Sequence, residues 1–295
     1  MSKKGLEGKI KLASYNDLFG LSDEDLNDEA SVRDIPLDEL HPFEGHPFRV
    51  LEDQKMNETV ASIKKHGVLV PGIARPRKAG GYEIISGHRR HHASGLAGKE
   101  TMPMIIKECS DDEAVIIMVD ANIQREEILL SEKAKAYKMK YDALKHQGKA
   151  GGFTVDIMAE ATGESNKTIQ RYVWLANLSD ELLELVDKKK LGIVQGVEIS
   201  FLPKEKQAWV YEILEEKGCS ISVAQAEEIR EKEKTGQLTK KIVQEILIGK
   251  SIKPRKVVFN AKRLDSYFPS HATNEDIEAV IIELLEEWKQ RGGVI

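Results

Sequence analysis

The sequence has few cysteines and no long apolar run, and each shortage excludes a class of protein. Its 295 residues include two cysteines, Cys109 and Cys219, which are too few for a disulfide framework or a four-cysteine zinc site. No apolar run approaches the roughly 18 residues that cross a bilayer, and residues 1–11 are basic and polar where a signal peptide is apolar. We therefore expect a soluble, cytoplasmic protein without membrane contact, and the length predicts two or three domains.

Charge is distributed unevenly along the chain, although the net charge is only −5. Residues 12–53 contain twelve acidic residues and two arginines, whereas residues 237–263 contain eight basic residues and one glutamate. Residues 264–295 return to seven acidic residues against two basic ones. Such segregation is typical of a modular protein, and the local basic stretch is compatible with nucleic acid despite the acidic average.

Turn signals and hydrophobic periodicity divide the chain into segments. Residues 1–34 are predicted to be a disordered tail, basic and then acidic, because like charges repel and there is little apolar surface to bury. Strands at 68–76 and 82–86 alternate with helices and predict an α+β domain over residues 35–128. The remainder has helical periodicity, which predicts an all-α helix-turn-helix domain over 129–195, a helical region over 196–235 and a mostly helical C-terminal region over 236–295.

Capping residues mark the ends of several predicted helices. Asp53 or Asn57 begins a short helix that Gly67 ends, and Ser131 and Asn274 are expected to cap two longer helices. The helix after Asn274 has a broad apolar face, which is either part of an internal core or the seam of a dimer.

The run Ser86-Gly87-His88-Arg89-Arg90 follows a predicted strand and opens a predicted helix. Backbone N–H groups and the helix dipole favour an anion at such a junction, glycine admits a close approach, and arginine matches phosphate oxygens in bidentate fashion. The alternative is a solvated turn. A second polar cluster, residues 120–127, offers a carbonyl oxygen for Mg²⁺ from Asn122, a phosphate contact from Arg125 and hard oxygen ligands from Asp120 or Glu126.

Together these motifs resemble the ParB/Spo0J family of partition proteins, in the version carried by mobile elements of low-GC bacteria. The matching runs, between Ile35 and about Leu178, are Pro47-Phe48-Arg49, Gly67 to Pro71, Tyr82 to Arg90 and Asn122 to Glu126. The resemblance implies a ParB/sulfiredoxin-like α+β fold with a site for CTP and Mg²⁺. The nucleotide-binding residues that it implies are Arg49, Ser86, Gly87, His88, Arg89, Arg90, Asn122, Arg125 and Glu126, with Asn122 as the Mg²⁺ ligand.

The chain departs from the family pattern at two points. Ala121 stands where the family has a glutamate implicated in metal binding and hydrolysis. We therefore expect that CTP binds while hydrolysis is slow or absent, unless Asp120 takes over that role. Pro47-Phe48-Arg49 replaces the more usual Gln-Pro-Arg, which leaves one phosphate contact open.

Residues 154–174 predict a helix-turn-helix. Small Ala159 permits close helix crossing and Gly163 makes the turn, while Ile157, Met158, Ile169 and Val173 supply apolar contacts between the helices. The alternative is an ordinary helical hairpin with a polar outer face. The second helix displays the residues that we expect to contact DNA, which are Ser165, Asn166, Lys167, Thr168, Gln170 and Arg171.

These features predict a homodimer that reads a palindromic, parS-like site in double-stranded DNA, because a two-fold protein matches a two-fold site. The resemblance further implies CTP-dependent closure of the N-terminal domains, a ParA-type ATPase as partner, and association with the nucleoid or a plasmid. Two alternatives stay open. One is a transcriptional regulator of a mobile element without a segregation role, and the other is a small-molecule kinase of related fold.

Overall fold

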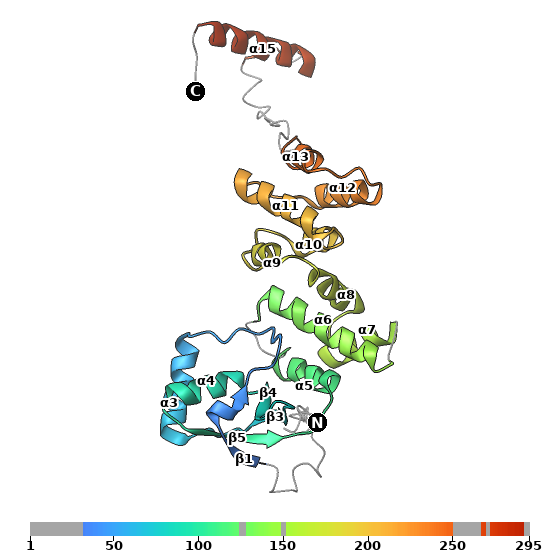
Figure 1. Ribbon diagram of the computed structural model, residues 1–295. Helices are drawn as coiled ribbons and strands as arrows, with labels where there is room; N and C mark the ends of the chain where they lie inside the picture. The colour runs from blue at the N-terminus through green and yellow to red at the C-terminus, as the bar shows by residue number, and fades with distance from the viewer. Residues whose placement is uncertain (1–31, 124–127, 149–151, 250–266, 270–271, 292–295) are drawn as a thin grey trace, which may run out of the picture. The chain divides into compact units, whose positions relative to one another are not determined.

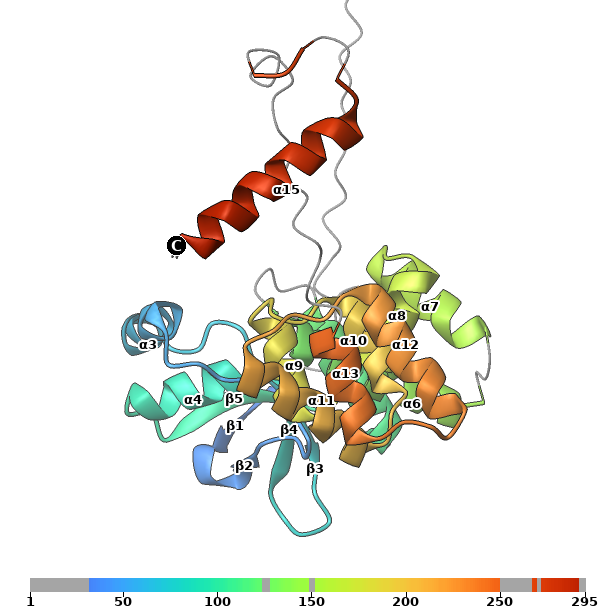
Figure 2. The ribbon, with the colours of Figure 1, turned by 90° about the horizontal axis from the view of Figure 1, so that it is seen from above.

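The computed structural model describes residues 32–123, 128–148, 152–249, 267–269 and 272–291. Contacts between residues divide the chain into two units, Met1–Gly249 and Lys250–Ile295. Figure 1 labels most elements of both units, and Figure 2 labels β2 as well.

A five-stranded mixed sheet with the strand order β1-β5-β3-β4-β2 organises the first part of the chain. The pairs β1/β5 and β3/β4 are antiparallel, whereas β5/β3 and β4/β2 are parallel. The elements of this sheet are β1 (Val32–Pro36), the 3-10 turn η1 (Leu37–Glu39), β2 (Leu40–His41), β3 (Gly72–Pro76), β4 (Tyr82–Ser86) and β5 (Thr101–Ile106).

The two faces of the sheet carry different apolar clusters, because successive side chains of a strand point to opposite sides. Ile73 and Ile85 belong to the cluster that includes residues of α5 (Asp111–Ile123). Their neighbours Ala74 and Ile84 belong to a second cluster on the opposite face. This alternation fixes α5 on one side of the strand that leads into the predicted phosphate motif.

Two further helices, α3 (Gln54–His66) and α4 (His88–Leu96), pack on each other through Met56, Ile63 and Ala93. They lie side by side in Figures 1 and 2. Because α4 follows β4 directly, the turn between strand and helix lies at one end of the sheet.

The described residues of the first unit after α5 are mostly helical and surround one cluster of buried side chains that runs from Ala134 to Leu247. Helix α10 packs closely on Leu175 of α8 at Gly196, where an added Cβ would lie 2.7 Å from Cδ1 of Leu175. The helices of this part are α6 (Leu130–His146), α7 (Gly152–Thr162), α8 (Asn166–Leu175), α9 (Asp180–Asp187), α10 (Ile193–Ser200), α11 (Lys204–Lys217), α12 (Val223–Lys234) and α13 (Lys240–Gly249).

In the second unit, α15 (Asn274–Gln290) carries exposed apolar side chains that include Leu284, Leu285 and Trp288. The predicted cap at Asn274 is wrong by one residue. The N–H of Asp276 donates to Oγ1 of Thr273, and the Asp276 carboxylate accepts from the N–H of Thr273, so the capping box begins at Thr273.

Three other boundaries differ from the sequence prediction. Residues 32–34, predicted to be tail, begin β1 because pairing with β5 satisfies their backbone groups. Residues 68–71, predicted to be strand, precede β3, and two of their carbonyls accept hydrogen bonds from an arginine side chain. Ser131 lies inside α6 and does not cap it, because its hydroxyl donates to Asp187.

Candidate nucleotide site and helix-turn-helix

The turn between β4 and α4 has the geometry that the sequence predicts for an anion site. Gly87 caps α4 with φ 108° and ψ 15°, a left-handed conformation that L side chains rarely adopt. A Cβ at this position would lie 3.2 Å from Cα of Gly72 and 3.3 Å from Nη2 of Arg90. Glycine is therefore required both by the backbone angle and by the space, and its flanking residues Ser86 and His88 are buried.

The two arginines of this motif have different anchors. Nη1 of Arg90 donates to the carbonyls of Val70, at 2.6 Å, and Pro71, at 2.8 Å. Nη2 of Arg89 lies 3.1 Å from Oδ1 of Asp53. Backbone carbonyls thus hold the guanidinium of Arg90. The guanidinium of Arg89 pairs with the Asp53 carboxylate, and a bound phosphate would compete with that carboxylate for it.

Asp53 connects Arg89 to the start of α3. Its side chain accepts the N–H of Met56 at 2.7 Å and so caps that helix. The hydrogen bond from Arg89, followed by that from Met56, lowers the pKa of the Asp53 carboxyl below its ordinary value.

The segment from Phe43 to Asp53 reaches from α4 to α5. Nε2 of His88 accepts the N–H of Phe43 at 3.3 Å, and the rings of His88 and His46 stack with centroids 3.8 Å apart. Phe48 is buried in the cluster that includes Met118 of α5. This segment therefore contacts the first predicted motif at both ends, through Phe43 and Asp53, and α5, which leads into the second motif, through Phe48 between them.

Two further predicted residues are Asn122, near the end of α5, and Arg49, within this segment. Asn122 is 3% exposed, and its Nδ2 donates to the carbonyl of Met118 at 2.7 Å, which leaves its carbonyl oxygen for a ligand. The N–H of Arg49 donates to Oε1 of Glu132 in α6 at 3.0 Å, while the Arg49 side chain is 59% exposed. Arg125 and Glu126, also predicted, lie outside the described residues.

Asp120 has a partner that the sequence did not reveal. Its carboxylate pairs with the ammonium of Lys140 in α6, whose side chain is 4% exposed. A buried ammonium without its carboxylate is costly, so Asp120 is committed to this ion pair. The structure thus argues against Asp120 as a substitute for the glutamate that Ala121 replaces.

The helix-turn-helix prediction agrees with α7 and α8. Ser165 caps α8 by accepting the N–H of Thr168, and Gly163 occupies the turn with φ 73°. Met158, Ile169 and Val173 are buried in the common helical core. The motif is therefore a packed helix pair rather than an isolated hairpin.

The six residues predicted to contact DNA differ in how free they are. Ser165, Asn166, Lys167 and Gln170 are exposed, whereas Thr168 and Arg171 are half-buried. Asn166 donates to the Asp156 carboxylate of α7, and the hydroxyls of Ser165 and Thr168 lie 2.8 Å apart. Asn166 and Thr168 thus brace the motif, and Lys167 and Gln170 are the exposed side chains that follow the cap.

A groove of about 460 Å³ lies between α8 and α10, and sequence analysis missed the second of these walls. The helix-turn-helix pattern ends before α10, so nothing local connects the two helices. The lining residues are Asn166, Lys167, Gln170, Arg171 and Trp174 from α8, with Val194, Val197 and Glu198 from α10.

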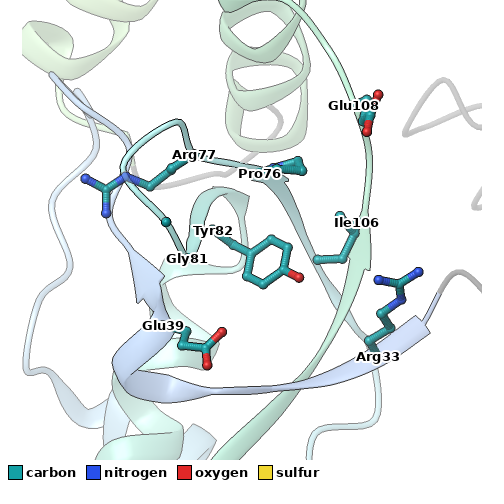
Figure 3. Close-up of a pocket in the computed structure, with 9 residues that line it drawn as sticks. Arg33, Glu39, Pro76, Arg77, Gly81, Tyr82, Ile106 and Glu108 are labelled. Carbon is teal, nitrogen blue, oxygen red and sulfur yellow. The ribbon is translucent and has the colours of Figure 1, made fainter.

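A separate cavity of about 400 Å³ lies near Tyr82, at the start of β4 (Figure 3). The Gly87 turn follows the other end of that strand. Arg33 and Arg77 line it together with Glu39 and Glu108. The balance of two cations and two carboxylates does not favour a phosphate there. Among the described residues, no helix is long and apolar enough to cross a membrane.

Comparison with known proteins agrees with this architecture. Residues 21–123 match the ParB N-terminal domain family. The chain is 29% identical over 203 residues to the chromosome-partitioning protein Spo0J of Thermus thermophilus, which covers 69% of this chain and 71% of that protein. It is 30% identical over 183 residues to a nucleoid occlusion protein of Halalkalibacterium halodurans. That alignment covers 60% of this chain and 62% of that protein.

Two solved structures of C-terminally truncated ParB from Caulobacter crescentus are also similar. The one complexed to the centromeric parS site has 23% identity and a TM-score of 0.41, and covers 68% of this chain and 99% of that chain. The one complexed with CTP-gamma-S has 25% identity and a TM-score of 0.31, and covers 58% of this chain and 92% of that chain.

The fold thus combines a mixed-sheet domain, with an anion-type turn at the start of α4, and a helix-turn-helix in one helical core. Residues 21–123 thus match the ParB N-terminal domain family, and the chain is similar to partition and nucleoid occlusion proteins over more than half of its length.

Proposed function

We propose that this chain is a partition protein that binds a specific double-stranded DNA site through α8, and that CTP with Mg²⁺ at the start of α4 controls this binding. One observation carries the proposal. The Gly87 turn and the start of α8 belong to one unit of the chain. Within this unit, Arg49 contacts α6, and α6 packs on α8. The name of one relative, the chromosome-partitioning protein Spo0J, supports the same conclusion.

The nucleotide part of the proposal assigns roles to residues of one end of the sheet. Backbone N–H groups at Gly87 and the guanidinium of Arg89 face the phosphates, and the exposed side chain of Arg49 adds a third contact. The ParB neighbour complexed with CTP-gamma-S supports cytosine as the base. The predicted residues Ser86, His88 and Arg90 shape and anchor this turn, and Arg125 and Glu126 remain part of the proposed set.

The proposed metal is one that takes most of its ligands from phosphate and water. Among the described residues, no group of three or more His, Cys, Asp or Glu side chains converges as a metal site. Mg²⁺ bound to nucleotide phosphates needs only one or two protein oxygens. The carbonyl oxygen of Asn122 fits that requirement, because its Nδ2 is already engaged by Met118.

Slow hydrolysis is part of the proposal, because Ala121 has no carboxylate and Asp120 is paired with Lys140. We predict that Ala121→Glu increases CTP hydrolysis, measured as phosphate release at saturating CTP and Mg²⁺. Ala121→Gln is the matched control, because it has similar length without the charge. Equal release from all three proteins, or rapid release from the unmodified chain, contradicts this assignment.

The DNA part of the proposal includes a homodimer on a palindromic, parS-like site, with a ParA-type ATPase as partner and the nucleoid or a plasmid as location. The apolar face of α15 supports a dimer seam in the C-terminal region. The predicted division into a domain over 35–128 and a helix-turn-helix domain over 129–195 is retained as part of this proposal.

The central test measures CTP affinity by titration calorimetry and maps bound genomic DNA with and without CTP. We expect Arg89→Ala to abolish CTP binding and its effect on the map, while the control Arg77→Ala, near the start of β4, preserves both. Absence of CTP binding by the unmodified chain overturns the nucleotide part. A map without a recurrent sequence overturns the DNA part.

Nucleoid occlusion is a second candidate function, because several relatives with 29–30% identity carry that name. The genomic map separates the two. A partition protein requires a cluster of sites at one locus of the replicon that it segregates, whereas occlusion requires sites distributed over the nucleoid. Sites confined to promoters would favour the transcriptional regulator.

A further inference from the structure

Two consecutive residues in the first turn of α6 contact different parts of the chain. Oε1 of Glu132 accepts the N–H of Arg49 and lies 3.9 Å from Nε of the same arginine. Lys133 pairs with Glu164, which lies in the turn between α7 and α8. Successive helix positions point about 100° apart, so one turn can serve both partners.

The Lys133–Glu164 pair is shielded from solvent. The two side chains are 22% and 24% exposed, and Nζ of Lys133 lies 5.6 Å and 5.0 Å from the ring centroids of Tyr137 and Tyr172. Burial and then the nearby Glu164 charge raise the pKa of Tyr137. Within the described part of the chain, Oε2 of Glu164 is buried without a hydrogen-bond partner, so the Glu164 carboxylate depends on Lys133 for compensation.

The same turn of α6 is tied to both ends of α9. Oγ of Ser131 donates to Asp187 at 2.5 Å, and Nζ of Lys135 lies 2.7 Å from Oδ1 of Asp180. The start of α6 therefore moves together with the helical core. A displacement at Arg49 reaches α8 through a braced helix rather than through a loose connection.

We propose that Glu132 and Lys133 are positioning residues that connect the nucleotide site to the DNA-reading helix. Glu132 holds the main chain of Arg49 so that its exposed guanidinium faces the phosphates. Lys133 holds Glu164 and thereby sets the start of α8, one residue after the Ser165 cap. This inference rests on the proposed function and adds to it the residues that transmit CTP occupancy to DNA affinity.

The test compares DNA affinity with and without CTP in full-length variants, and the ratio of the two affinities measures coupling. We expect Lys133→Met to bring this ratio closer to 1 by a factor of roughly 2 to 30, while the CTP affinity is unchanged. Lys133→Arg keeps the charge and the ratio. The matched control is Lys138→Met, which removes a pair with Asp142 on the same helix at 35% and 40% exposure.

A double variant separates transmission from simple destabilisation. Lys133→Met together with Glu164→Gln removes both charges and leaves no uncompensated carboxylate, so its thermal unfolding should recover toward that of the unmodified chain. Its coupling ratio should remain low. Recovery of the ratio together with stability shows that Lys133 acts only on stability, and overturns the inference.

A variant of Glu132 tests the part of the proposal that concerns CTP binding. Glu132→Ala should weaken CTP binding several-fold without changing the DNA affinity measured in the absence of CTP. An unmodified chain whose DNA affinity ignores CTP overturns the proposed gating and this inference with it. A responsive unmodified chain with a fully responsive Lys133→Met variant overturns only the inference.

Discussion

At the scale of single residues, side chains around the proposed CTP site have structural partners as well as assigned roles. Asp53 caps α3 and pairs with Arg89, while Asp120 neutralises the buried ammonium of Lys140. Such double engagement means that a substitution changes stability and ligand binding together. Variants that keep one contact and remove the other are therefore the informative ones.

Asp53→Asn is such a variant, because asparagine caps helices as well as aspartate but does not form an ion pair with Arg89. The folded-state pKa of Asp53 is lowered, so its stabilisation is present above the ordinary value of 3.8 and is lost as the pH falls through the lowered value. We predict that the loss of melting temperature between pH 7 and pH 3 is smaller in the variant. Thermal unfolding by circular dichroism measures this loss, with Asp38→Asn in η1 as control. An equal loss in variant and parent contradicts the pairing.

At the scale of elements, local signals predicted the helices best. Asp53 and Ser165 are caps whose partners lie three residues away, and Gly87 follows from the demand for a left-handed turn. Ser131 also looked like a cap, but Asp187, distant in sequence, takes its hydroxyl. Sequence patterns encode contacts within one turn, whereas a competing partner from another helix leaves no local trace.

The same reasoning explains what was missed in the candidate sites. Glu132 and Lys133 look like ordinary polar positions of an amphipathic helix, and their roles depend on Arg49 and Glu164 from other elements. The arginine motif was recognisable because one strand end and one helix start bring its residues together. Its anchors at residues 70 and 71 were hidden in a run that reads as strand.

The exposed start of α8 makes a separable prediction for Lys167 and Gln170. Gln170→Ala should lose about 1–3 kcal/mol of discrimination between the preferred DNA site and a single-base variant. Lys167→Ala should weaken binding to all sequences and reduce the slope of log affinity against log salt by about 1. Fluorescence anisotropy at several salt concentrations measures both, with Lys188→Ala at the C-cap of α9 as control. Identical behaviour of all three variants would contradict the assignment of α8.

At the scale of the whole molecule, the first unit joins two kinds of architecture. A mixed sheet carries the proposed nucleotide site, and a continuous helical core carries the helix-turn-helix. They meet where α5 packs on α6 and where Arg49, in the segment from Phe43 to Asp53, contacts the first turn of α6. Apolar packing also crosses this boundary, because Ile123 of α5 packs against both clusters and Ala136 of α6 is buried in the sheet-side cluster. Polar contacts such as that between Arg49 and Glu132 therefore add to a packed interface between α5 and α6.

The strand order has a further consequence for how the chain folds. Val32 pairs with Ile105 and Gly72 with Met104, so the sheet closes only after β5 is available, whereas α6, α7 and α8 pack as near neighbours in sequence. Contacts between distant residues slow folding because the entropy of loop closure is lost before the pairing is gained. The helical core should thus be able to refold first, and completion of the sheet should set the slower phase of refolding after dilution from denaturant.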